Sequence, residues 1–293
     1  MLAMNPEALR HYNLGVAFTE LGQHAEAERE YREALRLAPD APQAHNNLGV
    51  ALRHKGETEE AIKEFREAIR LRPDDAGAHT NLGNALGRLG YHEEEIREHR
   101  EAVRLDPDAP EPHSNLGNAL TNQGEHEEAA KELREAIRLK PDLAEAHYNL
   151  GLAFSKQGKT EEAIAAYREA IRLSPDVPEA HYNLGYALGD KGEMEEAIKE
   201  YRAAVRLKPD WTEAHYGLGV ALDEKGERDG AIQAYREAIR LKPDYAEALE
   251  NLAMDLDSQG KRKEAREFWE RAEKLEKRPN WVARIKKRLA ETD

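Results

Sequence analysis

The sequence predicts an all-α fold, an α-solenoid in which a short helix pair repeats along the chain. Three observations support this prediction. Runs of valine, isoleucine and threonine, which favour strands, are nearly absent. Alanine, glutamate, leucine, arginine and lysine, which favour helices, dominate the composition. Proline followed by aspartate recurs every 34 residues, a period typical of stacked helical repeats, at Pro39, Pro73, Pro107, Pro141, Pro175, Pro209 and Pro243.

This period divides the chain into eight repeats with no insertion between them. The repeats span residues 8–41, 42–75, 76–109, 110–143, 144–177, 178–211, 212–245 and 246–279. A lead-in of residues 1–7 precedes them, and a capping helix at 280–293 follows. In this last helix Asn280 can cap the N-terminus, and Trp281, Ile285 and Leu289 share one face. We expect that face to cover the open hydrophobic end of the stack.

Each repeat reads as two helices. The first is expected to begin just after the Pro–Asp pair, where the aspartate can cap free backbone N–H groups. It ends at a glycine, because glycine adopts the left-handed conformation that closes a helix; these are Gly22, Gly56, Gly90, Gly124, Gly158, Gly192, Gly226 and Gly260. The second begins with acidic residues such as Glu59 and Glu60, which suit the N-terminal end of the helix dipole. It stops at the next proline.

Fixed residue types at fixed positions predict how the two helices pack. Position 7 of every repeat is leucine, and position 8 is glycine in seven repeats and Ala253 in the eighth. A mid-helix glycine costs about 1 kcal/mol relative to alanine, so its recurrence indicates a close approach of the paired helix. We expect the residue that faces it to be the alanine usual at position 20. Position 24 is usually aromatic, as in Tyr31 and Phe65, and position 27 is always alanine.

This pattern, with Leu–Gly at positions 7 and 8, alanine at 20 and 27, an aromatic at 24 and proline at 32, resembles the tetratricopeptide repeat. The resemblance covers residues 8–279 and implies a right-handed superhelix that binds proteins or peptides. The Ala-His-x-Asn-Leu-Gly form, as in residues 180–185, is most similar to the tetratricopeptide superhelix of O-linked N-acetylglucosamine transferase. No catalytic domain of such an enzyme accompanies it here.

Composition argues against several classes of function. The formal net charge of -14 disfavours nucleic acid, which requires a basic patch. The absence of cysteine excludes disulfides, thiol catalysis and thiolate metal sites. No apolar run approaches the length of a membrane span and the start does not resemble a signal peptide, so we expect no membrane partner and a cytoplasmic location. Because no convergent catalytic cluster is found, we expect no enzymatic activity and no cofactor.

Histidine recurs at position 4, where we expect it to fill a packing slot. The column comprises His11, His45, His79, His113, His147, His181 and His215. Equivalent helices lie ~8–10 Å apart, which is too far for two of these rings to share a zinc ion. The third repeat breaks the pattern with Glu95 at position 20 and His99 at position 24. They lie one turn apart and could pair; either a metal or catalytic role or a polar, loosely packed joint would explain them.

The family resemblance implies that positions 2, 5, 6, 9, 12 and 13 face the concave groove. Position 6 forms a column of asparagines: Asn13, Asn47, Asn81, Asn115, Asn149, Asn183 and Asn251, with Gly217 in the seventh repeat. An asparagine amide both donates and accepts hydrogen bonds. The column is therefore interpreted as a ladder for a peptide backbone, a role that the similar transferase superhelix implies. The alternative is that asparagine is merely tolerated on a solvated face.

Tyrosines and acids at the other groove positions would select the ligand. The candidates are Tyr12, Tyr148, Tyr182, Tyr186, Tyr216, Glu179, Glu213, Asp223 and Glu224. The groove positions of repeats 1–4 carry two acids and two arginines, for a net charge of zero, whereas those of repeats 5–8 carry nine acids and one lysine, for a net charge of -8. An acidic, tyrosine-lined half-groove is expected to prefer a basic or proline-containing segment.

The sequence therefore predicts a non-enzymatic protein–protein interaction scaffold. Two alternatives from other classes stay open. One is a self-associating structural array, or a designed or consensus-like scaffold with no natural ligand, because the repeats are nearly uniform. The other is a metal-dependent enzyme built on the histidine-rich helices. The identity of the ligand, the oligomeric state and the origin of the sequence do not follow from the residues.

Overall fold

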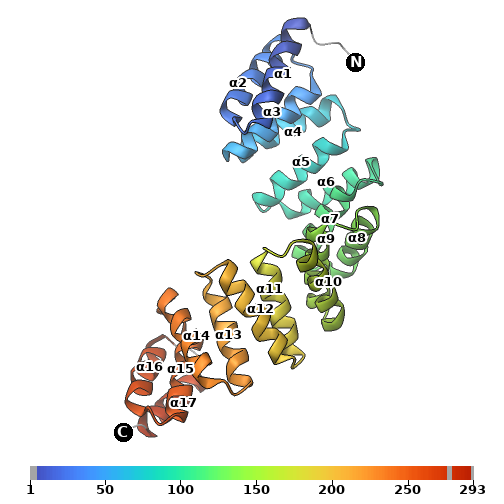
Figure 1. The fold of residues 1–293 in the computed structure, drawn as a ribbon. Coiled ribbons are helices and arrows are strands. Elements are labelled where there is room, and N and C mark those ends of the chain that lie inside the picture. The colour runs from blue at the N-terminus through green and yellow to red at the C-terminus, as the bar shows by residue number, and fades with distance from the viewer. Residues whose placement is uncertain (1–4, 276–278, 292–293) are drawn as a thin grey trace. The chain divides into compact units, whose positions relative to one another are not determined.

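A computed structural model describes residues 5–275 and 279–291, apart from the side chains of 279, 280, 284 and 291. These residues form seventeen α-helices, and no strand occurs among them (Figure 1). The all-α solenoid fold is confirmed. The chain divides into two compact units, residues 1–157 and 158–293, which are described separately. Within the described ranges, no helix combines the length and the apolar character needed to cross a membrane.

The first unit contains nine helices. They are α1 (Pro6–Glu20), α2 (His24–Leu37), α3 (Pro42–Lys55), α4 (Thr58–Leu71), α5 (Ala76–Arg88), α6 (His92–Leu105), α7 (Pro110–Gln123), α8 (His126–Leu139) and α9 (Ala144–Lys156). Helices α1, α3, α5 and α7 each pack against the next helix, and each even-numbered helix packs against the helix that follows it. The helix pairs therefore stack in chain order.

The second unit continues the same succession. It contains α10 (Thr160–Leu173), α11 (Pro178–Asp190), α12 (Met194–Leu207), α13 (Thr212–Glu224), α14 (Arg228–Leu241), α15 (Ala246–Ser258), α16 (Arg262–Leu275) and α17 (Pro279–Glu291). Here α11 pairs with α12, α13 with α14 and α15 with α16, while α17 packs against α16. First helices begin 34 residues apart from α3 to α15. The division into repeats at the boundaries given above stays a prediction.

The glycine that separates the helices of each pair has the conformation that the sequence predicts. All eight such glycines have a positive φ, between 71° and 87°. L-residues with a Cβ rarely adopt this left-handed region. The turn therefore depends on glycine, and it allows the second helix to fold back on the first.

The prediction that the Pro–Asp aspartates cap the first helices is wrong. In α3, α7, α11 and α13 the N-cap is the following residue, and its side chain makes no capping hydrogen bond. The aspartate lies one residue too early to reach the free N–H groups of the first turn. In α5 the cap is Asp75, which follows the Pro–Asp pair and accepts a hydrogen bond from the Ala78 N–H.

The partner of the mid-helix glycine also differs from the prediction. A Cβ placed on Gly15 would lie 2.5 Å from Tyr31 Cε1, and one placed on Gly49 would lie 2.6 Å from Phe65 Cε1. Thus the large residue at position 24 faces the glycine, rather than the alanine at position 20. Those alanines are nevertheless fully buried, as Ala27 shows. The glycine makes room for the ring that fills the core of each pair.

The last helix begins one residue earlier than predicted. Since α17 starts at Pro279, Asn280 lies within the helix and does not precede it as a cap. Ile285 is fully buried and α17 packs on α16, as a helix that covers the end of the core should. Residues 292–293 of the predicted capping helix and residues 1–4 of the predicted lead-in lie outside the described residues, as does the Asn280 side chain.

Candidate functional site

Three asparagines of the column form hydrogen bonds between neighbouring helix pairs. Asn47 Nδ2 donates to the Tyr12 hydroxyl at 3.1 Å, and Asn81 Nδ2 donates to Asn46 Oδ1 at 3.0 Å. Asn251 Nδ2 donates to the hydroxyls of Tyr216 at 3.3 Å and Tyr235 at 3.4 Å. These asparagines are half-buried. Each links position 6 of one repeat to position 5 of the repeat before it.

Other members of the column differ in exposure. Asn13 is exposed, and Asn115 and Asn183 are half-buried. Asn149 is only 4% exposed, and its Nδ2 has no hydrogen-bond partner among the described residues. The residue sixteen positions earlier differs between Asn149 and Asn251. For Asn251 this residue is Tyr235, whose hydroxyl accepts a hydrogen bond from Nδ2. For Asn149 it is Leu133, which has no hydroxyl.

In the second unit, position 5 forms part of an aromatic strip, which we define as Tyr182, Trp211, Tyr216 and Tyr245. The ring centroids of Tyr182 and Trp211 are 4.6 Å apart, and those of Tyr216 and Tyr245 are 5.0 Å apart. Lys208 Nζ lies 5.0 Å from the Trp211 ring centroid, and Lys242 Nζ lies 5.3 Å from that of Tyr245. The strip thus already holds cations against its rings.

Sequence reasoning identified the two strip tyrosines on the first helices but missed their partners. Trp211 and Tyr245 are the N-cap residues of α13 and α15, at the last position of a repeat. In repeats 1–5 that position is not aromatic: it holds Ala41, Asp75, Ala109, Leu143 and Val177. The aromatic residues at this position in repeats 6 and 7 could therefore have indicated the rest of the strip from the sequence.

The remaining predicted tyrosines are placed as follows. Tyr12 and Tyr148 are half-buried in the first unit, and the Tyr12 ring packs 6.0 Å from that of Tyr31. Tyr186 is 59% exposed on α11. Tyr182 and Tyr216 are half-buried, and burial raises the pKa of both hydroxyls. Both phenols therefore stay neutral hydrogen-bonding groups at physiological pH.

The predicted acids differ in how far they are already neutralised. Glu179 Oε1 lies 3.9 Å from Lys208 Nζ, and Asp223 Oδ1 lies 3.8 Å from Arg228 Nε. Glu213 and Glu224 are exposed, and neither forms an ion pair with a described residue. Surface ion pairs at such distances contribute only ~0–1 kcal/mol. The surface of α13 therefore keeps an excess of negative charge.

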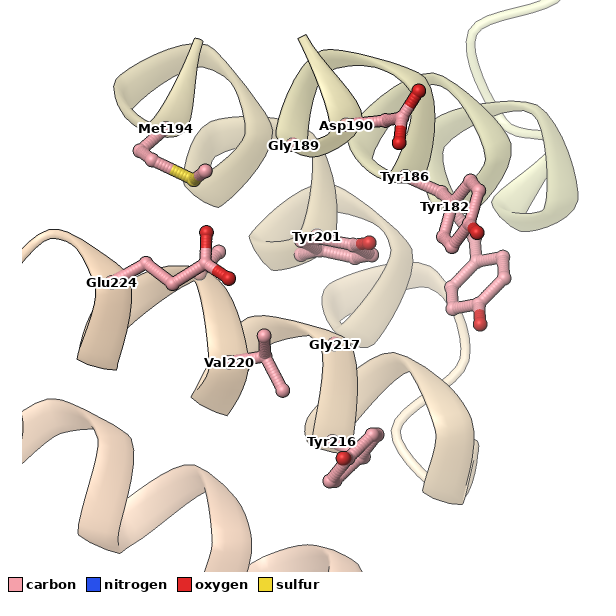
Figure 2. A pocket seen from close by; sticks show the side chains of 11 residues that line it. Tyr182, Tyr186, Gly189, Asp190, Met194, Tyr201, Tyr216, Gly217, Val220 and Glu224 are labelled. Carbon is pink, nitrogen blue, oxygen red and sulfur yellow. The ribbon is translucent and has the colours of Figure 1, made fainter. Parts of the chain in front are cut away.

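A small cavity opens beside the aromatic strip, within the second unit. Its volume is about 250 Å³. Its walls come from α11, α12 and α13, with Tyr182, Tyr186, Tyr201, Tyr216, Met194 and Val220 as the main apolar side chains (Figure 2). Asp190 and Glu224 add two carboxylates. We call it the Tyr201 cavity, because that ring lies between the helices that enclose it.

The histidine column does more than fill a packing slot. His79 Nδ1 lies 2.7 Å from Glu98 Oε2, and its Nε2 lies 3.1 Å from the Pro73 carbonyl oxygen. His181 has the same two partners, Glu200 at 2.6 Å and the Pro175 carbonyl at 2.9 Å. His45 and His113 repeat the arrangement.

Both ring nitrogens of His79 and His181 face oxygens that only accept hydrogen bonds, so both must donate. A neutral imidazole carries one N–H and the imidazolium carries two, and the geometry therefore favours the charged form. The hydrogen bond to Glu98 outweighs burial and raises the pKa of His79, and Glu200 does the same for His181. We call each such set a His–Glu–Pro bridge.

The two unusual residues of the third repeat do not pair with each other. Glu95 Oε2 lies 3.0 Å from His92 Nδ1, on the preceding turn. His99 is 1% exposed, and burial lowers its pKa to about 4. It occupies the same place as an aromatic, since a Cβ on Gly83 would lie 2.6 Å from His99 Cε1. No group of three potential ligand residues in the described part of the chain is placed to hold a metal ion.

A buried carboxyl in the eighth repeat escaped the sequence reasoning. Asp255 stands at position 10, which is alanine in the other seven repeats, and it is 4% exposed. Burial, together with the neighbouring Asp223, raises its pKa. Arg228 Nε is 3.9 Å from Asp255 Oδ1. Because position 10 is alanine in every other repeat, the aspartate at this position could have been recognised as unusual from the sequence.

Comparison with protein families gives one consistent match. A model described as tetratricopeptide repeat matches residues 12–76, 55–110, 148–211 and 182–246. Two related models, described as TPR repeat and tetratricopeptide repeat, match residues 117–158 and 246–272. No curated protein matches the sequence significantly.

Several solved structures resemble this one. YrrB, described as a TPR protein with an unusual peptide-binding site, is 26% identical with a TM-score of 0.56, covering 64% of this chain and 97% of its own. MamA is 28% identical with a TM-score of 0.51, covering 55% of this chain and 95% of its own. PilF of Pseudomonas aeruginosa, 24% identical with a TM-score of 0.63, covers 70% and 93% and supports the fold alone.

Proposed function

The chain belongs to the tetratricopeptide repeat family, and we propose that it is a non-enzymatic scaffold that binds an extended segment of a partner protein. The segment lies along the first helices of the repeats. In the second unit, basic or proline-containing sequences are preferred. One observation carries this proposal: aromatic and unpaired acidic side chains lie together in the second unit. Exposed Tyr186 lies on α11, and the unpaired Glu213 and Glu224 lie on α13. The aromatic strip joins α11 and α13 to the residues that precede α13 and α15.

The aromatic strip supplies contact area at a low entropic cost, because a tyrosine or tryptophan side chain has only two rotatable bonds to order. Its rings also attract cations, as the positions of Lys208 and Lys242 show. Glu213 and Glu224 add long-range attraction for a positively charged segment. The peptide-binding site described for YrrB is consistent with this class of function.

We also propose that the asparagine column holds the backbone of the segment, as the resemblance to the transferase superhelix implies. Its members are Asn13, Asn47, Asn81, Asn115, Asn149, Asn183 and Asn251. An amide has two N–H groups and a carbonyl oxygen, and the inter-repeat hydrogen bonds of Asn47 and Asn81 use one donor each. The rest of each amide is then left for a ligand. Asn149 is too buried to contribute without a local rearrangement.

The test is an array of basic, proline-containing and acidic peptides, probed with the wild-type protein and two tyrosine variants. Tyr186→Ala is expected to weaken binding of basic peptides about tenfold, as loss of an aromatic anchor does. Tyr91→Ala is the matched control, because Tyr91 is 54% exposed at the turn before α6, away from the groove positions. Equal losses in the two variants, or a preference for acidic peptides, would contradict the proposal.

A second candidate, self-association, rests on the N-terminal helix pair. Leu14 is 36% exposed, although the leucines at the same position in α3 and α5 are 1% and 3% exposed. Leu9 is 46% exposed on the same helix. Two copies could cover this surface. Light scattering over a concentration series, with Leu9→Glu as the variant, decides between the candidates: a dimer that dissociates in the variant supports self-association, and a monomer at every concentration rules it out.

A further inference from the structure

The Tyr201 cavity differs from the equivalent places in the other repeats because one side chain is missing. Position 6 is asparagine in seven repeats and glycine at Gly217. In the next repeat, the Asn251 side chain fills this place, and its Nδ2 donates a hydrogen bond to the hydroxyl of Tyr235, sixteen residues earlier. Gly217 leaves the corresponding place beside Tyr201 empty, and the cavity lies there, lined by both residues.

The Tyr201 ring has shifted toward the missing side chain. A Cβ on Gly185, its partner at position 8, would lie 3.2 Å from the nearest ring atom, whereas the equivalent distances for Gly15, Gly49 and Gly219 are 2.5, 2.6 and 2.5 Å. Conversely, a Cβ on Gly217 would lie 2.7 Å from Tyr201 Cε1. The Tyr201 ring therefore lies between two glycines on different helices, Gly185 and Gly217, and position 6 is glycine in no other repeat.

The hydroxyl of Tyr201 makes no hydrogen bond to a described residue, and the residue as a whole is only 5% exposed. Figure 2 shows it directed toward the side where Tyr182 and Tyr186 lie. Burial keeps this phenol neutral, because it raises its pKa. A phenol can both donate and accept a hydrogen bond, so this hydroxyl is free to bind a ligand atom in the cavity.

The mouth of the cavity is negative. Asp190 and Glu224 line it, and both are exposed. The adjacent lysines pair elsewhere: Lys191 Nζ lies 2.8 Å from Glu193 Oε1, and Lys225 Nζ lies 3.0 Å from Glu227 Oε1. Within the described part of the chain, neither Asp190 nor Glu224 has a basic partner.

We propose that the Tyr201 cavity binds one lysine or arginine side chain of the bound segment and so anchors it. The aliphatic stem packs on the tyrosine rings, Met194 and Val220, and the cationic head lies against ring faces and pairs with Asp190 and Glu224. A volume of about 250 Å³ is below the ~300–1,000 Å³ of drug-sized sites, which fits one side chain. This assignment rests on the proposed segment-binding function, which it makes specific.

The first test uses single-residue probes on the full-length protein. N-acetyl-lysine and N-acetyl-arginine methylamides are titrated, with the uncharged norleucine and the acidic glutamate analogues as controls. Binding is read from the NMR amide signals of Gly189 and Gly217. Lysine and arginine are expected to shift both signals in a saturable way and to bind about tenfold more tightly than norleucine, by ion pairing with a partly buried site. Equal binding of norleucine would overturn the assignment to a cation.

Variants then locate the site. A Cβ on Gly189 would meet no atom within 4 Å, so Gly189→Leu fills the cavity while the fold is kept, and probe binding is expected to be lost. Glu224→Gln should weaken binding of the lysine probe about fivefold. Glu162→Gln changes the net charge equally, at an exposed residue of α10 outside the cavity lining, and should change binding of the lysine probe less than twofold. Equal losses in the two glutamine variants would show attraction by the overall charge and overturn the site.

Longer peptides separate the two levels of the proposal. If lysine-containing peptides bind the wild type and Gly189→Leu equally well, segment binding stands and the cavity assignment fails. If the single-residue probes bind and no peptide of the array binds, the cation site stands and the segment-binding function fails. Loss of peptide binding in Gly189→Leu, with an unchanged circular dichroism spectrum, supports both.

Discussion

Two departures from the repeat pattern, one in each unit, have opposite structural consequences. His99 replaces the usual aromatic at position 24, yet it is 1% exposed and approaches Gly83 as closely as Phe65 approaches Gly49. Gly217 replaces the usual asparagine at position 6, and a cavity of about 250 Å³ opens beside it. The His99 ring thus preserves the packing of its helix pair, although burying an imidazole costs electrostatic free energy. The loss of the side chain at Gly217 instead changes the shape of the surface and leaves a cavity.

The difference shows which kind of departure can create a binding site in a repeat protein. His99 gives the first unit a buried, neutral imidazole whose Nδ1 lacks a hydrogen-bond partner among the described residues, and its ring fills the space beside Gly83. Gly217 gives the second unit space, an unpaired phenol and two nearby carboxylates. Three experiments, taken from the largest expected effect to the smallest, test this contrast.

The largest effect is expected at His99 under acidic conditions. Burial lowers its folded-state pKa to about 4, below the unfolded value of about 6.5. Between these values the unfolded chain binds a proton that the folded protein excludes, so stability present above pH ~6.5 is lost as the pH falls, by up to about 3 kcal/mol. His99→Phe should remove this loss, as measured by urea unfolding at neutral and acidic pH.

A control separates His99 from histidines in general. His92→Phe changes a residue whose side chain is 43% exposed and should leave the acid dependence almost as in the wild type. Amide hydrogen exchange in α5 and α6 should report the protection that His99→Phe restores. An acid dependence that is identical in His99→Phe and the wild type would contradict the assignment.

A smaller effect is expected from adding a methyl group beside each ring. Gly83→Ala would place a Cβ 2.6 Å from His99, whereas Gly185→Ala would place one 3.2 Å from Tyr201. Overpacking of a filled core costs about 1–3 kcal/mol, and replacing glycine in a helix regains about 1 kcal/mol. Gly83→Ala should therefore lower the free energy of unfolding, while Gly185→Ala should change it little because Tyr201 has already moved away. Equal losses of stability in Gly83→Ala and Gly185→Ala would mean that the larger distance between Gly185 and the Tyr201 ring does not make room for a methyl group.

The smallest effect concerns the His–Glu–Pro bridges, which are alike in the two units. Hydrogen bonds raise the pKa of His79 and His181 above the unfolded value. The stabilisation is therefore complete below pH ~6.5 and is lost as the pH rises through the folded-state pKa. His79→Gln and His181→Gln should each cost about 1 kcal/mol at pH ~6 and less at high pH, as measured by thermal unfolding.

The matched control is His215→Gln. His215 keeps the bond from Nε2 to the Pro209 carbonyl at 2.9 Å, but position 234, nineteen residues later, is alanine instead of glutamate. This variant should lose less stability at pH ~6 than His181→Gln, because it removes one of these two hydrogen bonds instead of both. A loss of stability of the same size in all three variants would mean that the glutamates do not stabilise His79 and His181.

Much of the fold could be predicted because it depends on short-range patterns. The positive φ of Gly56 and the other turn glycines, and the acidic first turn that contains Glu59 and Glu60, are local properties. The capping prediction failed because it required the exact helix start, which lies one residue beyond Asp40 and its equivalents. Helix ends are the least certain part of any prediction from pattern.

The candidate site was predictable only in part. Tyr182 and Tyr216 could be identified as a column, but Trp211 and Tyr245 join them from the preceding turns. The histidines could be placed in a core position, but their glutamate partners lie nineteen residues away on another helix. Such pairings depend on how two helices face each other, and the period alone does not specify that.

The sequence by itself determined the all-α repeat architecture and the family, because a 34-residue period of glycine, alanine and proline admits one way of folding back and stacking. It also marked Gly217 and His99 as exceptions. Only the tertiary structure decided what each exception does. The position of the Tyr201 ring depends on two glycines from different helices, Gly185 and Gly217, and whether a missing side chain leaves a cavity depends on whether its neighbours can move to fill it.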